Sequence, residues 1–172
     1  NIIAVTGTNG KSSIADFYYQ ILDLNNKKVA SIGTLGIKSK KYKKNLSNTT
    51  IDPIQLSKIL NKLKKQNINN VIMEASSHGL SQNRLDGLLF NTGIFTNLSQ
   101  DHLDYHKNTK NYLKAKLYLF EKLIKTKGAI ITDEKIPEFK KIKNIAINKN
   151  LNLFTLLDKK NNFQFLSHQY EH

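Results

Sequence analysis

The chain has 172 residues, of which 39% are hydrophobic, and it carries 27 Lys and Arg against 13 Asp and Glu, for a net charge of +14. It contains no cysteine, which excludes disulfide scaffolds and thiol catalysis and fits a cytoplasmic protein, and no apolar stretch approaches the roughly 20 residues of a membrane span. The length suits one domain, or one domain with a tail. Since the chain opens on Asn1 directly before an apolar run, we expect a domain taken from a longer protein.

The positive charge has two interpretations. A surplus of this size permits binding to nucleic acid or another polyanion. However, the basic residues are nearly all Lys, spread along the chain, and they are not interleaved with aromatic residues as on a base-stacking surface. We therefore expect a small anionic substrate such as a nucleotide, and no nucleic-acid or membrane partner.

The first predicted elements enclose a glycine-rich segment. Residues Ile2–Val5 form an apolar run that is typical of a buried strand, and Ile14–Leu24 show the apolar spacing of a helix. Between them lies Thr6–Ser13, with the sequence TGTNGKSS. A strand, a glycine loop and a helix that starts near Lys-Ser form the arrangement of a phosphate-binding loop.

The loop chemistry follows from its glycines and its Lys-Ser pair. Gly7 and Gly10 allow a tight turn whose N–H groups approach an anion, and the helix N-terminus adds unpaired donors. In this arrangement Lys11 meets the β- and γ-phosphates and the Ser12 hydroxyl holds Mg²⁺. Val5 stands where the common loop has glycine, so the motif is shortened to G-x-x-G-K-S. The alternative is a glycine turn before a helix, with a lysine that is merely solvated.

Further strands and helices alternate along the chain. The predicted strands are residues 28–37, 71–75, 90–95 and 129–132. The predicted helices are residues 53–66, where Asp52 is the expected N-cap and Pro53 lies in the first turn, and residues 112–124. Residues 38–48 and 98–106 are predicted to be polar loops.

Beyond Asp133 the predicted elements become short. Residues 145–147, 151–157 and 163–166 are predicted strands, which we expect to form a small antiparallel edge near the C-terminus. The alternation of strands and helices predicts an α/β fold with a mostly parallel sheet flanked by helices, of the phosphate-loop type.

Ligands of such a sheet gather at the carboxyl ends of the strands. The glycine loop, residues 74–78 and residues 97–102 all lie at or just after predicted strand ends. We therefore expect these three segments to converge on one edge of the sheet.

Glu74 lies at the end of the apolar run 71–73, where a carboxylate is costly unless it is paired or binds metal. It is well placed to join Ser12 on Mg²⁺, which prefers oxygen ligands. The alternative is a carboxylate that accepts hydrogen bonds from the next loop.

Two further groups remain ambiguous from spacing alone. Residues 101–106 (DHLDYH) hold two imidazoles and two carboxylates, which suit either a transition-metal site or a loop capped by its own Asp side chains. Lys116 lies inside a predicted helix, either on its solvated face or beside its buried stripe.

Taken together, these segments resemble the Mur ligase family. The similar stretches run in sequence order across residues 2–132, and they fit best the members that add the third amino acid of the peptidoglycan stem. They are TGTNGKS at 6–12, NTT at 48–50, EASSHGL at 74–80, Gln82 with Arg84, TNLSQDHLDYH at 96–106, and Tyr112 to Lys116. Gln100 stands where many members have a basic residue, and residues after 133 match no motif.

The resemblance implies an ATP-dependent amide ligase of peptidoglycan precursor synthesis that works through an acyl phosphate. ATP and Mg²⁺ are the implied cofactors, and a UDP-N-acetylmuramoyl dipeptide and an amino acid are the implied partners. Residues 1–172 would form the central ATP-binding domain, between an N-terminal UDP-binding domain and a C-terminal domain that selects the amino acid.

The resemblance also implies roles for individual residues. Lys11, Lys116 and His102 would be catalytic, and ATP would be bound by Gly7, Thr8, Asn9, Gly10, Lys11, Ser12 and Ser13. Ser12 and Glu74 would hold one Mg²⁺, and His102, with Lys116 if it is carbamylated, a second. The muramoyl substrate would be bound by Asn48, Thr49, Thr50, Ser76, Gln82 and Arg84. We expect His78, Asp104 and His106 to organise their loop rather than to bind metal.

Two other hypotheses remain. The chain is alternatively a family member of the folylpolyglutamate or cyanophycin type, although the Ser76-Ser77-His78 stretch argues against it. It is otherwise a basic phosphate-loop module that binds nucleic acid, which salt-dependent retention on DNA would favour.

Overall fold

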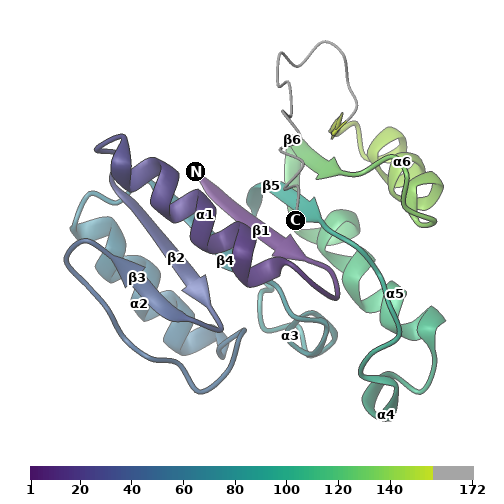
Figure 1. Ribbon diagram of the computed structural model, residues 1–172, viewed down its shortest axis with the longest axis horizontal. Helices are drawn as coiled ribbons and strands as arrows, with labels where there is room; N and C mark the ends of the chain where they lie inside the picture. The colour runs from purple at the N-terminus through teal and green to yellow at the C-terminus, as the bar shows by residue number, and fades with distance from the viewer. Residues whose placement is uncertain (157–172) are drawn as a thin grey trace, which may run out of the picture.

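The computed structural model describes residues 1–156 and forms one seven-stranded sheet with the order β3-β2-β4-β1-β5-β6-β7 (Figure 1). The strands are β1 (Ile2–Thr6), β2 (Val29–Gly33), β3 (Gly36–Ser39), β4 (Asn70–Glu74), β5 (Phe90–Phe95), β6 (Ile124–Thr132) and β7 (Asn152–Thr155). Neighbouring strands are parallel except for β2 and β3. The predicted α/β fold with a mostly parallel sheet is therefore confirmed.

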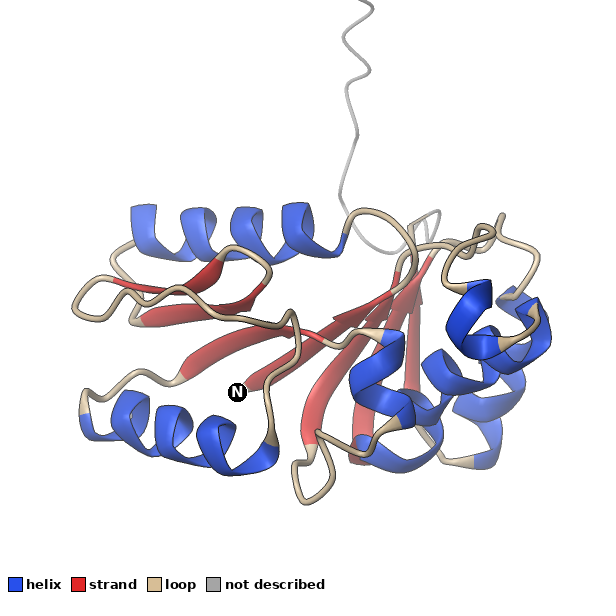
Figure 2. Ribbon diagram, turned by 90° about the horizontal axis from the view of Figure 1, so that it is seen from below, coloured by secondary structure: helices blue, strands red, loops and turns tan. Residues whose placement is uncertain are grey.

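Helices lie on both faces of the sheet (Figure 2). They are α1 (Lys11–Leu24), α2 (Pro53–Lys65), α3 (Ser77–Ser81), α4 (Leu103–His106), α5 (Thr109–Tyr118), a π-helical turn η1 (Leu119–Leu123) and α6 (Phe139–Asn148). The larger hydrophobic core contains residues of α2, α5, η1 and α6, whereas α1 contributes Ala15 to a small separate cluster with Ile3, Val5 and Ile72. None of the helices within residues 1–156 is long and apolar enough to cross a membrane.

The predicted position of the antiparallel edge was wrong. Residues 28–37, predicted as one strand, form the β2–β3 hairpin, which turns at Thr34 and Leu35 and uses Gly36 at a φ of 82°. This hairpin is the antiparallel edge, and it lies at the opposite end of the sheet from β7. Because Gly33 and Gly36 bracket only two residues, the chain reverses tightly instead of continuing as a single strand.

The C-terminal part of the described chain also differs from the prediction. Residues 145–147, predicted as a strand, belong to α6, whose buried residues Ile142 and Ala146 are four apart, as on one helix face. Because α6 connects β6 to β7 as a crossover, β7 joins the sheet in parallel rather than antiparallel orientation. β7 lies within the predicted strand at 151–157, and the predicted strand at 163–166 lies outside the described residues.

Helix boundaries agree where capping chemistry was visible in the sequence. The Asp52 carboxylate accepts a hydrogen bond from the Gln55 N–H at 2.9 Å, and Pro53 is the first residue of α2, as predicted. Residues 98–106, predicted as a polar loop, contain the single turn α4. The helix predicted at 112–124 begins three residues earlier, at Thr109, and its last turn is η1.

Candidate active site

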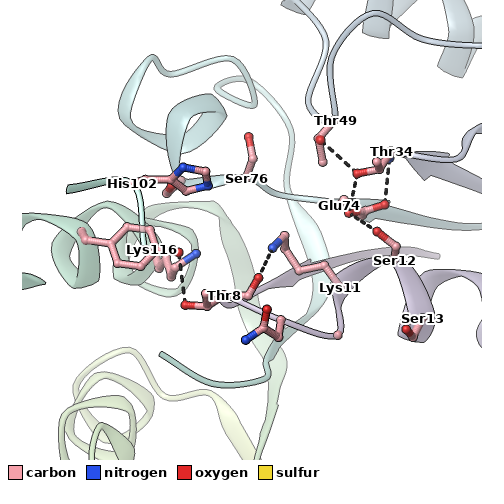
Figure 3. A pocket seen from close by; sticks show the side chains of 14 residues that line it. Thr8, Lys11, Ser12, Ser13, Thr34, Thr49, Glu74, Ser76, His102 and Lys116 are labelled. Atoms are coloured by element: carbon pink, nitrogen blue, oxygen red, sulfur yellow. Dashed lines mark hydrogen bonds between the residues drawn. The ribbon is translucent and has the colours of Figure 1, made fainter. Parts of the chain in front are cut away.

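Three loops meet at the carboxyl ends of β1, β4 and β5, as the sequence predicts, and enclose a cavity of about 350 Å³ (Figure 3). Lys11, Glu74 and His102 all line this cavity, although they are far apart in the chain. The other lining residues are Thr8, Asn9, Gly10, Ser12, Ser13, Thr34, Thr49, Ser76, Ser77, Tyr112 and Lys116. The lining is dominated by hydroxyl, amide and charged groups, which suits a polar, anionic ligand.

The glycine loop adopts a conformation that requires its glycines. Gly7 has a φ of 144°, and a Cβ atom there would collide with the Thr96 hydroxyl. Gly10, at a φ of 83°, is the N-cap of α1, and no side chain caps this helix end. The N-terminus of α1 therefore faces the cavity with donors and a positive dipole end that suit a phosphate.

The segment after β5 braces the loop. The Asn97 carbonyl accepts from the Thr8 N–H at 2.9 Å, and the Asn97 side-chain oxygen accepts from the Asn9 N–H at 3.0 Å. The Thr96 hydroxyl donates to the Asn9 carbonyl at 2.7 Å, and the Thr8 hydroxyl accepts from the Ser99 N–H at 3.0 Å. These contacts hold the loop in shape before any ligand binds.

Two lysines converge on the carbonyl oxygen of Gly7. The Lys11 Nζ donates to it at 2.9 Å and to the Thr8 carbonyl at 2.7 Å, and the Lys116 Nζ donates to it at 2.7 Å. Lys116 is only 1% exposed. Burial, and next the charge of Lys11, lower the pKa of Lys116 to about 7, and burial also lowers the pKa of Lys11. Neither ammonium has a carboxylate partner among the described residues, so the pair favours an anion.

Tyr112 holds Lys116 in place from one helical turn earlier in α5. Its ring centroid lies 4.3 Å from the Lys116 Nζ, and its hydroxyl lies 3.2 Å from the Thr8 hydroxyl. The side chain is buried, and this burial raises the pKa of Tyr112. Sequence reasoning did not identify Tyr112 as a site residue, although its spacing of four from Lys116 places both on one helix face.

Glu74 is a buried carboxylate, 2% exposed, at the end of β4. Its Oε2 accepts from the Ser12 hydroxyl at 3.0 Å and from the Thr34 hydroxyl at 3.1 Å, and its Oε1 accepts from the Thr34 N–H at 2.8 Å. A Cβ atom at Gly33 would collide with this carboxylate, so the glycine makes room for it. Both carboxylate oxygens accept hydrogen bonds, which agrees with the alternative that Glu74 is paired with a neighbouring loop. The contact with Ser12 agrees with the alternative that Glu74 and Ser12 bind Mg²⁺ together.

The residues present fit Mg²⁺ at this position. A carboxylate and a hydroxyl 3.0 Å apart form a hard oxygen pair of the kind that holds Mg²⁺ together with substrate phosphates and water. Within residues 1–156 there is no cluster of three or more His, Asp or Glu side chains that would hold a metal ion by protein ligands alone. The transition-metal interpretation of residues 101–106 therefore gains no support from the geometry.

His102 lines the cavity. Its backbone is in the left-handed region, with a φ of 51°. The Asp101 carboxylate accepts from the His102 N–H at 2.8 Å and lies 3.5 Å from its Nε2. The His102 ring centroid is 4.9 Å from that of His78, which in turn lies 5.5 Å from His106. Burial lowers the pKa of both His78 and His106, which favours the neutral form of these two rings.

The predicted substrate residues divide into two groups. Thr49 and Ser76 line the cavity, and the buried Thr50 hydroxyl links the Glu74 carbonyl at 3.0 Å to the Ser76 N–H at 2.9 Å. The Arg84 Nη1 donates to the Thr50 carbonyl at 2.7 Å from outside the cavity. Gln82, bonded to the Tyr105 hydroxyl at 3.0 Å, and the exposed Asn48 also lie outside it. The structure brings only part of this set to the cavity.

The chain is similar to known proteins in sequence and in fold. Residues 5–172 match the family described as Mur ligase middle domain. A UDP-N-acetylmuramoyl-L-alanyl-D-glutamate–2,6-diaminopimelate ligase of Wigglesworthia glossinidia brevipalpis is 47% identical over 149 residues, which make up 86% of this chain and 30% of the relative. The ligase of the same name from Rickettsia montanensis is 43% identical over 161 residues, which make up 91% of this chain and 33% of the relative.

Solved structures give the same result. A ligase of the same name superimposes with a TM-score of 0.78 and 32% identity over 90% of this chain and 31% of the other. E. coli FolC in complex with DHPP and ADP superimposes with a TM-score of 0.60 over 88% of this chain and 41% of the other, and its 19% identity shows the fold alone. The chain spans about a third of the length of the curated relatives named above.

Proposed function

Because the chain belongs to the Mur ligase family, we propose that residues 1–172 are the central ATP-binding domain of a peptidoglycan precursor ligase. The ligase adds the third stem amino acid to UDP-N-acetylmuramoyl-L-alanyl-D-glutamate. The names of the two relatives given above support this substrate. The observation that carries the proposal is the meeting of Lys11, Glu74 and Lys116 in one polar cavity at the carboxyl edge of the sheet.

The reaction explains why such a cavity is needed. A carboxylate is a poor electrophile, so it first takes the γ-phosphoryl group of ATP to form an acyl phosphate, and the amine of the amino acid then displaces phosphate. Both ATP and the acid are anions and repel each other. Fixed cations and N–H donors that are already in position offset this repulsion and stabilise the charge that develops on the phosphoryl group.

The glycine loop is the proposed triphosphate site. The N–H groups of Gly10–Ser13, at the N-terminus of α1, would bind the phosphates, because those of Thr8 and Asn9 already donate to Asn97. Lys11, which the Gly7 and Thr8 carbonyls hold at the loop, would place its ammonium against the β- and γ-phosphates. Ser12 and Glu74 would hold Mg²⁺, which neutralises phosphate charge when bound.

Lys116 is proposed to be carbamylated. With its pKa lowered to about 7, a large share of the side chain is a neutral amine at neutral pH. The neutral amine nitrogen would bond to the carbon of CO₂ and release one proton, which puts a carboxylate-like anion with two oxygens in place of the amine. These oxygens, together with His102, which also lines the cavity, would serve a second Mg²⁺.

The muramoyl dipeptide is proposed to approach from the side of Thr49 and Ser76. Arg84 is suited to a carboxylate or phosphate of this substrate because its guanidinium has donors beyond the one that binds the Thr50 carbonyl. Asn48 and Gln82 would reach the parts of the substrate that extend beyond the cavity. We propose that separate UDP-binding and amino-acid-selecting domains complete this side in the whole ligase.

The test is amide ligation by the complete ligase that contains this chain, supplied with UDP-N-acetylmuramoyl-L-alanyl-D-glutamate, ATP and either diaminopimelate or lysine. We expect a tripeptide product, and a loss of at least about 100-fold in kcat for Lys116→Ala because a group that stabilises the transition state is removed. Ligation of glutamate to a folate, or retention on DNA without response to the muramoyl dipeptide, would instead support the two other hypotheses. Normal ligation by Lys116→Ala would refute the role of this lysine.

A further inference from the structure

Thr34 contacts both carboxylate oxygens of Glu74, although no motif in the sequence points to it. It lies in the turn of the β2–β3 hairpin, 40 residues away from Glu74 in the chain. Its backbone N–H donates to Oε1 at 2.8 Å and its hydroxyl donates to Oε2 at 3.1 Å. One residue therefore fixes the rotation of the carboxylate, with Ser12 as the only other residue that donates to it within residues 1–156 (Figure 3).

The Thr34 hydroxyl also contacts Thr49, on the proposed substrate side of the cavity. The Thr34 Oγ1 lies 3.0 Å from the Thr49 Oγ1. A hydroxyl has one proton, and that of Thr34 is used on the Glu74 carboxylate, which accepts only. Thr49 must therefore be the donor between the two threonines, and it presents only lone pairs to the cavity.

We propose that Thr34 is a positioning residue that orients Glu74 for the metal and connects it to Thr49, so that the metal side and the substrate side of the cavity depend on each other. This inference rests on the proposed function. It also defines the chemistry that Thr49 recognises. Thr49 accepts a hydrogen bond from an N–H or O–H group of the substrate, such as a peptide amide or a sugar hydroxyl, and does not bind a phosphate oxygen.

A purely structural role for Thr34 makes different predictions. Gly33 and Gly36 flank the tight turn, and Thr34, within the turn, is exposed rather than packed in the core. Thr34→Val keeps the branched shape and the backbone N–H but removes the hydroxyl, whereas Thr34→Ser keeps the hydroxyl. If only the turn mattered, Thr34→Val would behave like the wild type.

The first experiment measures ATP binding to the 172-residue chain by calorimetry, with Mg²⁺ and with EDTA. We expect Thr34→Val to weaken binding about tenfold in Mg²⁺ and to leave binding in EDTA unchanged, because loss of a partner that orients a metal ligand has effects of this size. Thr34→Ser should restore the wild-type value. Thr155→Val is the matched control, since it removes a threonine-to-carboxylate hydrogen bond of the same length, from Thr155 to Glu134 at 3.1 Å, away from the cavity.

The second experiment measures the KM for the muramoyl dipeptide in the complete ligase. We expect Thr34→Val and Thr49→Val each to raise this KM, and the double variant to raise it by less than the product of the two effects, because both break one hydrogen-bonded chain. Independent, multiplicative effects would contradict the proposed connection.

The outcomes separate the two proposals. If wild-type chain binds ATP equally with Mg²⁺ and with EDTA, the metal assignment of the proposed function fails, and the role of Thr34 fails with it. If Mg²⁺ strengthens ATP binding to the wild type and strengthens ATP binding to Thr34→Val equally, only the proposed role of Thr34 is overturned. A loss in Thr34→Val that is equal in EDTA would also overturn it, because the residue would then act through the fold.

Discussion

The proposed nucleotide side and the proposed substrate side of the site are built differently. On the nucleotide side, the glycine loop is braced by residues 96–99, and Glu74 and Lys116 are almost completely buried. On the substrate side, Asn48 and Gln82 are exposed and lie outside the cavity. The first side is part of the fold, whereas the second, apart from the buried Thr50, consists of partly or fully exposed groups. We therefore expect changes on the nucleotide side to affect stability and ligand binding together, and changes on the substrate side to affect ligand binding almost alone.

The largest expected effect is that of Gly7→Ala. The new Cβ would collide with Thr96 at a backbone φ of 144°, so the variant should lose about 3 kcal/mol or more of unfolding free energy, together with ATP binding. Urea denaturation measures the loss. Gly87→Ala is the control, because Gly87 also has a positive φ, of 87°, but no atom lies near its added Cβ, and it should lose only about 1 kcal/mol. Equal losses in both variants would mean that the contact of the loop with Thr96 is not tight.

The next largest effect is expected for Lys116→Met, which should change how the unfolding free energy depends on pH. The pKa of Lys116 is about 7 in the folded chain and 10.5, its ordinary value, in the unfolded chain. Between these two pH values the unfolded state binds more protons than the folded state. The unfolding free energy of the wild type therefore rises as pH rises. The variant lacks this gain. From about pH 7 to 9 the unfolding free energy of the wild type should rise by about 2 kcal/mol relative to Lys116→Met.

Urea titrations at several pH values test this expectation. Lys114→Met, on the exposed side of the same helix, controls for the loss of one positive charge. Parallel stability profiles of wild type and Lys116→Met would contradict the buried position of the Lys116 ammonium.

A smaller effect on stability is expected for Arg84→Ala. The change removes the hydrogen bond to the Thr50 carbonyl at 2.7 Å, which should lower the unfolding free energy by about 1 kcal/mol. ATP affinity of the chain should stay the same, while the KM for the muramoyl dipeptide in the complete ligase should rise about tenfold or more. Calorimetry and steady-state kinetics separate the two. If ATP affinity also fell, the prediction would be wrong, and Arg84 would contribute to nucleotide binding.

The smallest effect on stability is expected for Asn48→Ala. Asn48 is exposed, and the one hydrogen bond of its side chain to any residue from 1 to 156, to the Ser47 hydroxyl, is long at 3.4 Å. The unfolding free energy should change by less than about 0.5 kcal/mol, and any loss should appear only in the KM for the muramoyl dipeptide. A large destabilisation in urea would show that this segment belongs to the folded framework.

The same division explains how much the sequence could predict. The glycine loop, the end of β4 and the end of β5 were predictable because each has a local pattern, and the rules of parallel sheets bring strand ends together. Thr34 was not predictable, since its contacts with Glu74 depend on a hairpin that resembles one glycine-broken strand. Residues 145–147 were misassigned because a short apolar run has no clear period by itself.

Tyr112 illustrates a further limit. Its place on the buried side of α5 could be predicted from helical spacing, but its contact with Thr8 arises from segments 104 residues apart. Such contacts exist only after the sheet has formed. The proposed roles of Thr49 and Ser76 depend in addition on contacts with a substrate, which no local sequence pattern describes.

The most direct test of the central claim is a crystal structure of the chain with a non-hydrolysable ATP analogue and Mn²⁺ in place of Mg²⁺, with the metal located by its anomalous scattering. The account predicts the triphosphate along Gly7–Ser13, with the metal peak bound to the Ser12 hydroxyl and the Glu74 carboxylate. A nucleotide bound elsewhere, or a metal peak away from both side chains, would contradict it.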